Sequence, residues 1–97
     1  MWIGWIEFDL LLSDVHSLKE KRAVLRPALA ELRRATEASV AEVGGQDLHR
    51  RGAIGVGIVA SEADWVTDVL DRAERLAAAH PEFTLLATRR RPPARRR

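Results

Sequence analysis

The segment HSLKEKR, residues 16–22, combines a helix-start pattern with a high density of positive charge. Ser17 is a natural N-cap and Glu20 follows three residues later, so together they form a capping box. The first turn of a helix exposes backbone N–H groups at the positive end of the helix dipole, where phosphate groups bind. The segment therefore predicts a helix start and, beside it, a docking place for an anionic group.

Further basic residues lie close to this helix start. At about 100° per residue, four basic residues of the predicted helix fall within roughly 60° of one another: Lys19, Arg22, Arg26 and Arg33. The loop GGQDLHRR, residues 44–51, adds two arginines. The alternative interpretation is a solvated basic face, partly neutralised by neighbouring acidic residues. The candidate RNA- or anion-binding residues are His16, Ser17, Lys19, Lys21, Arg22, Arg26, Arg33, Gln46, His49, Arg50 and Arg51.

No residue pattern predicts catalysis. Glu7 and Asp9 stand two apart on a predicted strand and could form an acid and base pair. The favoured interpretation is that they pair with arginines of the last strand, such as Arg90. The segment GVG, residues 55–57, lacks the spacing, the lysine and the following helix of a nucleotide loop, and no nucleophile motif is present. We therefore expect a binding protein rather than an enzyme, with no cofactor.

The hydrophobic pattern predicts six elements that position these residues. A kink is expected at Pro27, inside the first helix. The element order is that of the ferredoxin-like βαββαβ fold of the α+β class, a four-stranded antiparallel sheet with two helices on one face and the strand order 4-1-3-2. The predicted elements are strands over residues 2–12, 39–43, 52–60 and 82–88, a helix over residues 18–36, and a second helix between Ser61 and His80.

This topology places three loops at one pole of the domain: the loop after the first strand, the loop between the second and third strands, and the loop after the second helix. His16, His49 and His80 lie one in each loop, with Asp47 and Glu42 nearby. Such a set could hold zinc, but none of the histidines shares a helix turn or a tight motif with another. Hydrogen-bonded surface histidines are the favoured interpretation, and no metal is expected.

The face of the sheet without helices carries apolar side chains. Trp5 is predicted to point out from the first strand, with Gly55 and Gly57 beside it on the third. Because a bare apolar patch marks an interface, the pattern predicts a homodimer through the sheet; alternatively, Trp5 lies flat over the two glycines as a cover. RNA stacking on this face is not expected, because the paired aromatics of an RNP pattern are absent. The candidate sheet-face residues are Ile3, Trp5, Leu11, Gly55, Gly57 and Leu86.

The length of 97 residues predicts one domain, residues 1–88, followed by an arginine-rich tail, residues 89–97. The tail, RRRPPARRR, holds six arginines and no acidic residue, so the body before it is acidic. Its two prolines oppose a helix and it has little to bury, so disorder is predicted. The tail either tethers a nucleic acid or folds loosely against the acidic body.

Composition excludes several other classes of protein. There is no cysteine, hence no disulfide framework and no thiolate metal site. No apolar run reaches the roughly 18 residues that a membrane span needs. We therefore expect a cytoplasmic protein without membrane contact.

The segments HSLKEKR and SVAEVGGQDLHRR, in this order and at this distance, resemble the YlxP-like family of small bacterial proteins, classed as domain of unknown function 503. The resemblance covers nearly all of residues 1–88, and SVAEVGGQDL is its most specific part. It implies a ferredoxin-like fold, a bacterial cytoplasmic protein, and genes that often lie near those for translation initiation and ribosome maturation. The family has no established catalytic residues, so none are assigned.

Two functions are therefore expected as alternatives. In the first, the protein contacts RNA or a ribosomal subunit through the basic pole, made of the first helix's N-terminus and the loop between the second and third strands. In the second, it is a homodimeric protein-interaction or small-ligand-binding domain that uses the open sheet face and binds no nucleic acid.

Overall fold

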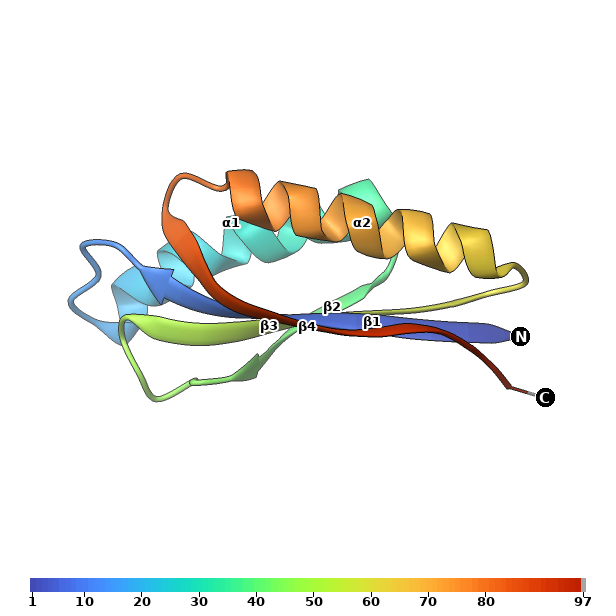
Figure 1. Cartoon of the computed structure of the whole chain (residues 1–97). Coiled ribbons are helices and arrows are strands. Elements are labelled where there is room, and N and C mark those ends of the chain that lie inside the picture. The colour runs from blue at the N-terminus through green and yellow to red at the C-terminus, as the bar shows by residue number, and fades with distance from the viewer. Residues whose placement is uncertain (97) are drawn as a thin grey trace.

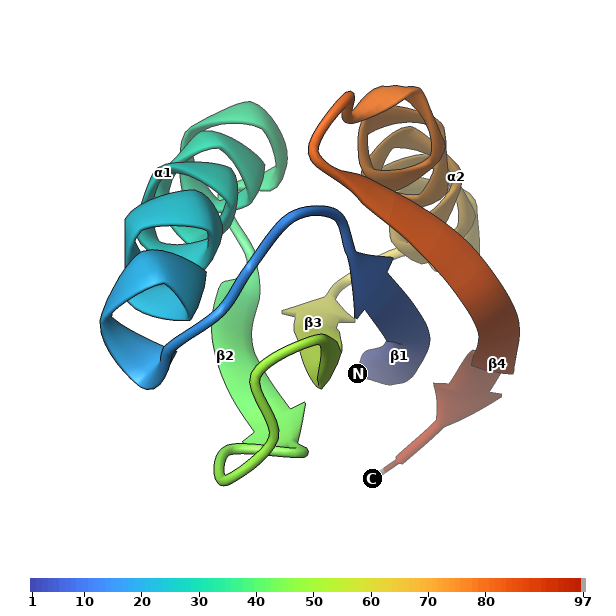
Figure 2. The ribbon, with the colours of Figure 1, turned by 90° about the vertical axis from the view of Figure 1, so that its left-hand side faces the viewer.

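Six elements of secondary structure follow one another in a computed structural model that describes residues 1–96 (Figure 1). The sheet has the strand order β2-β3-β1-β4, with every neighbouring pair antiparallel. Both helices lie side by side on one face of the sheet (Figure 2). The ferredoxin-like prediction is confirmed. The elements are β1 (Trp2–Leu12), α1 (Leu18–Thr36), β2 (Ser39–Gly44), β3 (Arg51–Ala60), α2 (Ala63–Ala79) and β4 (Phe83–Arg95).

The core lies between the sheet and the two helices, and strand β1 supplies its centre. The alternating pattern of β1 turns one side of the strand inward, and the inward side chains from Ile6 to Leu12 are fully buried. A Cβ at Gly4 would overlap the side chain of Val66, so glycine is needed there for α2 to approach the strand. The fully buried side chains of β1 are Ile6, Phe8, Leu10 and Leu12.

Helix α1 begins where the capping pattern predicts. The Ser17 hydroxyl accepts the Glu20 N–H at 3.1 Å, and the Glu20 carboxylate accepts the N–H of His16 at 2.6 Å, one residue earlier than in a standard capping box. The helix continues through the exposed Pro27 to Thr36, and its C-cap is Glu37, whose φ of 55° is left-handed. Neither helix in residues 1–96 is long and apolar enough to cross a membrane.

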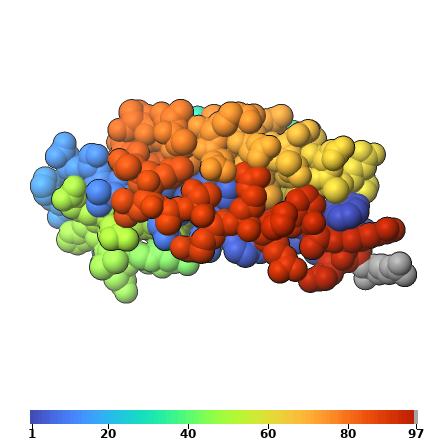
Figure 3. All heavy atoms as spheres, viewed as in Figure 1, coloured from blue at the N-terminus to red at the C-terminus, as the bar shows by residue number. Residues whose placement is uncertain are grey.

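The structure differs from the predicted boundary between a domain of residues 1–88 and a disordered tail. Strand β4 continues to Arg95 and pairs with the whole length of β1. The space-filling view shows this segment running along the side of the domain to the end where the chain begins (Figure 3). Composition alone favoured disorder, but β1 has an outer edge of unpaired backbone groups that the arginine-rich segment satisfies. Pro92 and Pro93 are tolerated because β4 is an edge strand and they fall at a register shift. Arg97 lies outside the described residues.

The two ends of the described chain lie together because β1 and β4 are antiparallel neighbours. The Met1 ammonium donates to the Arg96 carbonyl at 3.0 Å, and the Arg96 N–H donates back to the Met1 carbonyl at 2.7 Å. Both ends are therefore at the pole opposite the three loops (Figure 1).

Candidate functional site

The three loops predicted to share one pole are joined there by backbone hydrogen bonds (Figure 2). The N–H of Leu12 donates to the Arg50 carbonyl at 2.7 Å, and the N–H of Ser13 donates to the Glu82 carbonyl at 3.3 Å. These contacts link the β1–α1 loop to the β2–β3 loop and to the α2–β4 loop. The basic pole is thus a single surface made from distant parts of the sequence.

Lys21 is a buried lysine rather than a surface cation, which corrects its predicted place among the anion-binding residues. Its side chain is 3 % exposed, and its ammonium donates to the carbonyls of Gly45 at 2.6 Å and Leu48 at 2.8 Å. It also lies 3.0 Å from a carboxylate oxygen of Glu42, outside hydrogen-bond geometry, so that contact is electrostatic. Lys21 therefore fastens the β2–β3 loop to α1.

Two further predicted arginines are engaged with the backbone. Arg33 donates through Nε at 3.2 Å and through Nη2 at 2.7 Å to the carbonyl of Val40, which ties the end of α1 to strand β2. Arg50 donates through Nε at 3.2 Å to the carbonyl of Leu12. Ser17 is occupied as the N-cap of α1. Ser17 and Arg50 shape the pole, whereas Arg33 acts at the other end of α1, so the three contribute less free surface at the pole than the sequence predicted.

The remaining predicted residues stay exposed, and three of them border a hollow of about 290 Å³ between α1 and the end of β2. Arg22, Arg26 and Gln46 line it at the surface, and the apolar side chain of Leu25 lines it from the core. Neither arginine has an ion-pair partner within residues 1–96. The other exposed members of the predicted set are His16, Lys19, His49 and Arg51.

The predicted convergence of histidines does not produce a metal site in the described part of the chain. The ring of His80 stacks on Phe83, with 4.2 Å between ring centroids, and its Nδ1 accepts the Glu82 N–H at 3.2 Å. No group of three or more histidine, aspartate or glutamate side chains in residues 1–96 could hold a metal ion. His80 thus closes the α2–β4 loop.

The face of the sheet opposite the helices, here called the open face, gathers large exposed apolar side chains. Trp5 is 42 % exposed, Val43 50 % and Val59 61 %. Leu86, exposed on β4, alternates with Leu85, which packs on the core. Ile3 stands opposite Val59 in the register of β1 and β3, so both belong to this face. An apolar patch of this kind on an isolated chain marks an interaction surface.

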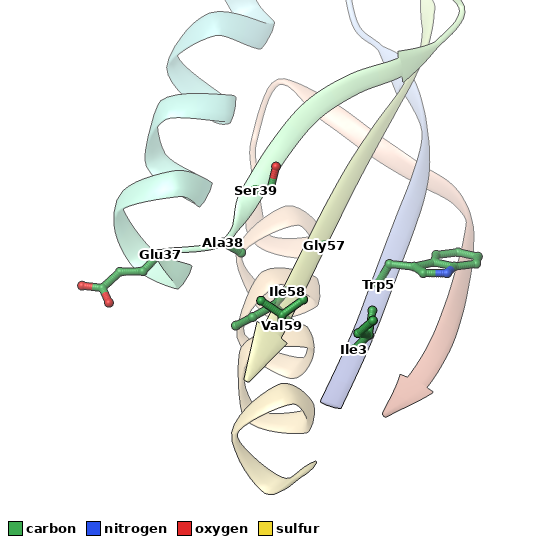
Figure 4. A pocket seen from close by; sticks show the side chains of 9 residues that line it. Ile3, Trp5, Glu37, Ala38, Ser39, Gly57, Ile58 and Val59 are labelled. Carbon is green, nitrogen blue, oxygen red and sulfur yellow. The ribbon is translucent and has the colours of Figure 1, made fainter. Parts of the chain in front are cut away.

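A groove follows strand β3 on the open face (Figure 4). Two adjoining hollows of about 440 and 300 Å³ share Trp5, Ser39 and Gly57 in their lining. Gly57 is directly opposite Trp5 in the register, yet a Cβ built on Gly57 would meet no atom within 4 Å. Figure 4 shows the indole pointing away from Gly57, toward β4. The alternative in which Trp5 lies flat over the glycines is therefore wrong, and Val43 instead covers Gly55.

Glu7 and Asp9 are held by an arginine of β4, as predicted, but the arginine is Arg89. Its guanidinium reaches Glu7 at 2.8 Å and both oxygens of Asp9 at 2.9 and 3.0 Å. The hydrogen bonds from Arg89 hold the pKa of Asp9 below its ordinary value; the charges of Arg89 and Arg51 act in the same direction, and desolvation opposes them. Arg90 points to the other side of the strand and pairs with Asp71 at 2.7 Å and Glu74 at 2.9 Å. The two carboxylates therefore fasten β4 to β1 and are not free for acid and base chemistry.

Comparison with known proteins identifies the family of the chain. Residues 3–90 match the family described as "Protein of unknown function (DUF503)", and the chain belongs to that family. It is 33 % identical over 87 residues to "Uncharacterized protein YlxP" of Bacillus subtilis (strain 168), a match that covers 90 % of this chain and 95 % of that protein.

A solved structure shares the arrangement of elements. A mutant of SnoaB, a cofactor-independent oxygenase from Streptomyces nogalater, superposes with a TM-score of 0.51 at 10 % identity over 99 % of this chain and 93 % of that chain. At this identity the likeness concerns the fold alone.

Proposed function

We propose that the protein is a binding module that contacts RNA, free or within a ribosomal subunit, through its basic pole. The observation that carries the proposal is the exposed stripe of Lys19, Arg22 and Arg26 on α1, which has no ion-pair partner within the described residues. Cations that the fold does not use are available to neutralise phosphate and release counterions. At about 1.5 Å per residue, the stripe extends roughly 10 Å along the helix, enough for more than one phosphate.

The loop beside the stripe supports the same function. Gln46 and His49 stand on the β2–β3 loop, which Lys21 fastens to α1 through two carbonyls. A loop held in place presents its polar groups at a fixed distance from the cations, so little ordering is needed when a ligand binds. Polar side chains of this type contact ribose and phosphate and position the protein without reading sequence. Lys21 is thus a positioning residue of the proposed surface.

The test compares the wild-type chain with the variant Arg22→Glu/Arg26→Glu in binding to ribosomal subunits and to bulk RNA across a salt series. Both arginines are exposed and make no contact that the fold needs, so the variant should remain folded. The control is Arg34→Glu/Arg75→Glu, the same change of charge at exposed arginines away from the hollow.

We expect the control to bind like the wild type and the Arg22→Glu/Arg26→Glu variant to lose affinity at low salt. Its slope of log affinity against log salt should also fall by about 0.7 for each lost phosphate contact to a single strand. Equal loss in both variants would show binding through net charge alone and would refute the proposed surface. Absence of binding by every chain would favour the alternative, a domain that uses the open face and no nucleic acid.

A further inference from the structure

The open face carries an exposed tryptophan, Trp5, and an empty space above Gly57, here called the Gly57 slot. No side chain of the same chain fills that slot. Trp5 is half exposed and turns away from Gly57, its direct neighbour in the register. The space above Gly57 is empty to at least 4 Å from the position of a Cβ. A large indole in water and an apolar slot without an occupant both raise the free energy of the isolated chain.

A second copy of the chain matches both features at once. Trp5 on β1 and Gly57 on β3 face each other across adjacent strands at one level of the sheet. A two-fold axis parallel to the strands, midway between β1 and β3 and between two facing sheets, sets Trp5 of each copy over Gly57 of the other. Such an isologous arrangement closes on itself and gives a dimer. We propose that the open face is a homodimer interface in which each Trp5 indole turns from its place beside β4 and fills the Gly57 slot of the other copy.

The same axis brings apolar residues opposite apolar residues elsewhere on the face. Ile3 is the register partner of Val59 across β1 and β3, so each meets the other residue in the second copy. The axis also sets β2 of one copy over β4 of the other. Val43 and Leu86 stand on these two strands near the level of Asp9, so they approach one another between copies. One two-fold axis therefore brings each exposed apolar side chain of the face against an apolar side chain of the second copy.

Charge does not oppose this contact. Glu7 and Asp9 are the acidic side chains of β1 on this face, and Arg89 of the same chain is bonded to both. Arg89 and the neighbouring Arg51, whose charge also acts on Asp9, are two cations for two carboxylates, so contact between two faces does not place unpaired carboxylates against each other.

The size of the face is also sufficient. Strands of about ten residues at about 3.3 Å per residue, four across at about 4.8 Å, give roughly 600 Å² in projection. The accessible area of a surface with grooves exceeds its projection, so the face approaches the roughly 800 Å² per partner of a stable interface. This inference is independent of the proposed contact with RNA. That contact uses the exposed side of α1 and the β2–β3 loop, which do not belong to the open face.

The first test measures the oligomeric state of the full chain by sedimentation equilibrium over a range of concentrations. The variant Gly57→Leu places a side chain in the slot, and its Cβ would meet no atom within 4 Å, so the variant should fold and remain monomeric. Trp5→Ser removes the side chain that would fill the slot, so this variant should also be monomeric. The control is Trp65→Ser, at a tryptophan of α2 that is 44 % exposed and away from the face. Each substitution counts twice in a symmetric dimer, so we expect a loss of about 10³-fold in dimer affinity for the two face variants.

The second test uses the absence of cysteine in the sequence. A Trp5→Cys chain mixed with a Gly57→Cys chain should form disulfides between the two variants in preference to disulfides within either population. A wild-type chain that stays monomeric, a dimer that tolerates Gly57→Leu, or cross-links without preference would each overturn the proposal. The first of these outcomes would leave the face to a small ligand or to another protein.

Discussion

The basic pole and the open face differ in how far the chain itself uses their side chains. At the pole, Lys21 and Arg50 donate to backbone carbonyls, so part of the positive charge there organises loops. On the open face, Trp5 and Gly57 are paired across adjacent strands, but the Trp5 side chain does not pack over Gly57. A cluster of charges can therefore serve mainly to hold loops in place, whereas the exposed Trp5 and the empty space above Gly57 have no role within the single chain.

Loss of the buried ammonium is expected to have the largest effect on the architectural part of the pole. The substitution Lys21→Met leaves two carbonyls and the Glu42 carboxylate without their cation, which should lower the free energy of unfolding by about 3 kcal/mol. Urea denaturation measures the change. Lys19→Met, at an exposed lysine two residues earlier on the other side of α1, should cost less than about 0.5 kcal/mol. Equal stabilities of the two variants would remove the distinction between architectural and free cations.

Independence of the two surfaces is the next expectation. Trp5→Ser should abolish dimers while leaving the RNA affinity per chain within about 3-fold, because no phosphate contact is touched. Arg22→Glu/Arg26→Glu should do the reverse, with a loss of RNA affinity on the order of 10²-fold at low salt and an unchanged dimer. Sedimentation and filter binding on the same samples check both. If one variant impairs both activities, the two surfaces are coupled and the comparison fails.

Removal of the end of β4 should have a smaller effect on stability than the loss of Lys21. A chain of residues 1–88 lacks Arg89 and Arg90 with both of their ion-pair clusters, and exposes the outer edge of β1. We expect a loss of about 2 kcal/mol in the free energy of unfolding, because exposed ion pairs and edge hydrogen bonds contribute modestly. Thermal denaturation of the two chains measures the change. An unchanged stability would restore the predicted domain boundary at residue 88.

The smallest expected effect is the decrease in stability at low pH that comes from the pair of Asp9 and Arg89. Because Arg89 lowers the pKa of Asp9, the ionised carboxylate contributes stability above the ordinary aspartate pKa of about 4, and this contribution is lost as the pH falls through the lowered value. The urea midpoint of the wild type should therefore decrease below about pH 4. In Arg89→Gln the same decrease should be weaker. Parallel curves for the two chains would show that the pair has no linkage to folding.

Much of the fold could be predicted because it follows from local patterns. The alternation of β1 gives its buried side, and the Ser17 cap gives the start of α1. The order of the elements then limits the topology to the observed strand order. The family likeness predicted from two segments is also found over residues 3–90.

The errors arose where residue type was given more weight than position. Lys21 lies one turn after Leu18 and one turn before Leu25, on the buried arc of α1, and that spacing was a usable signal of burial. The arginine-rich segment was predicted to be disordered from composition, although an 11-residue β1 needs a partner along its outer edge. The direction of the Trp5 side chain could not be predicted, because a rotamer depends on packing that the sequence does not display.

The pairing of the chain ends has a mechanical consequence. β1 and β4 are antiparallel neighbours, with Met1 bonded to Arg96, so a force applied to the two ends loads one hydrogen bond at a time, along the direction of each bond. Pulling by the ends should peel β4 away like a zipper at low force. A force applied between the β2–β3 loop and the last residues of β4 would instead shear the sheet, and the same domain should then resist far higher tension.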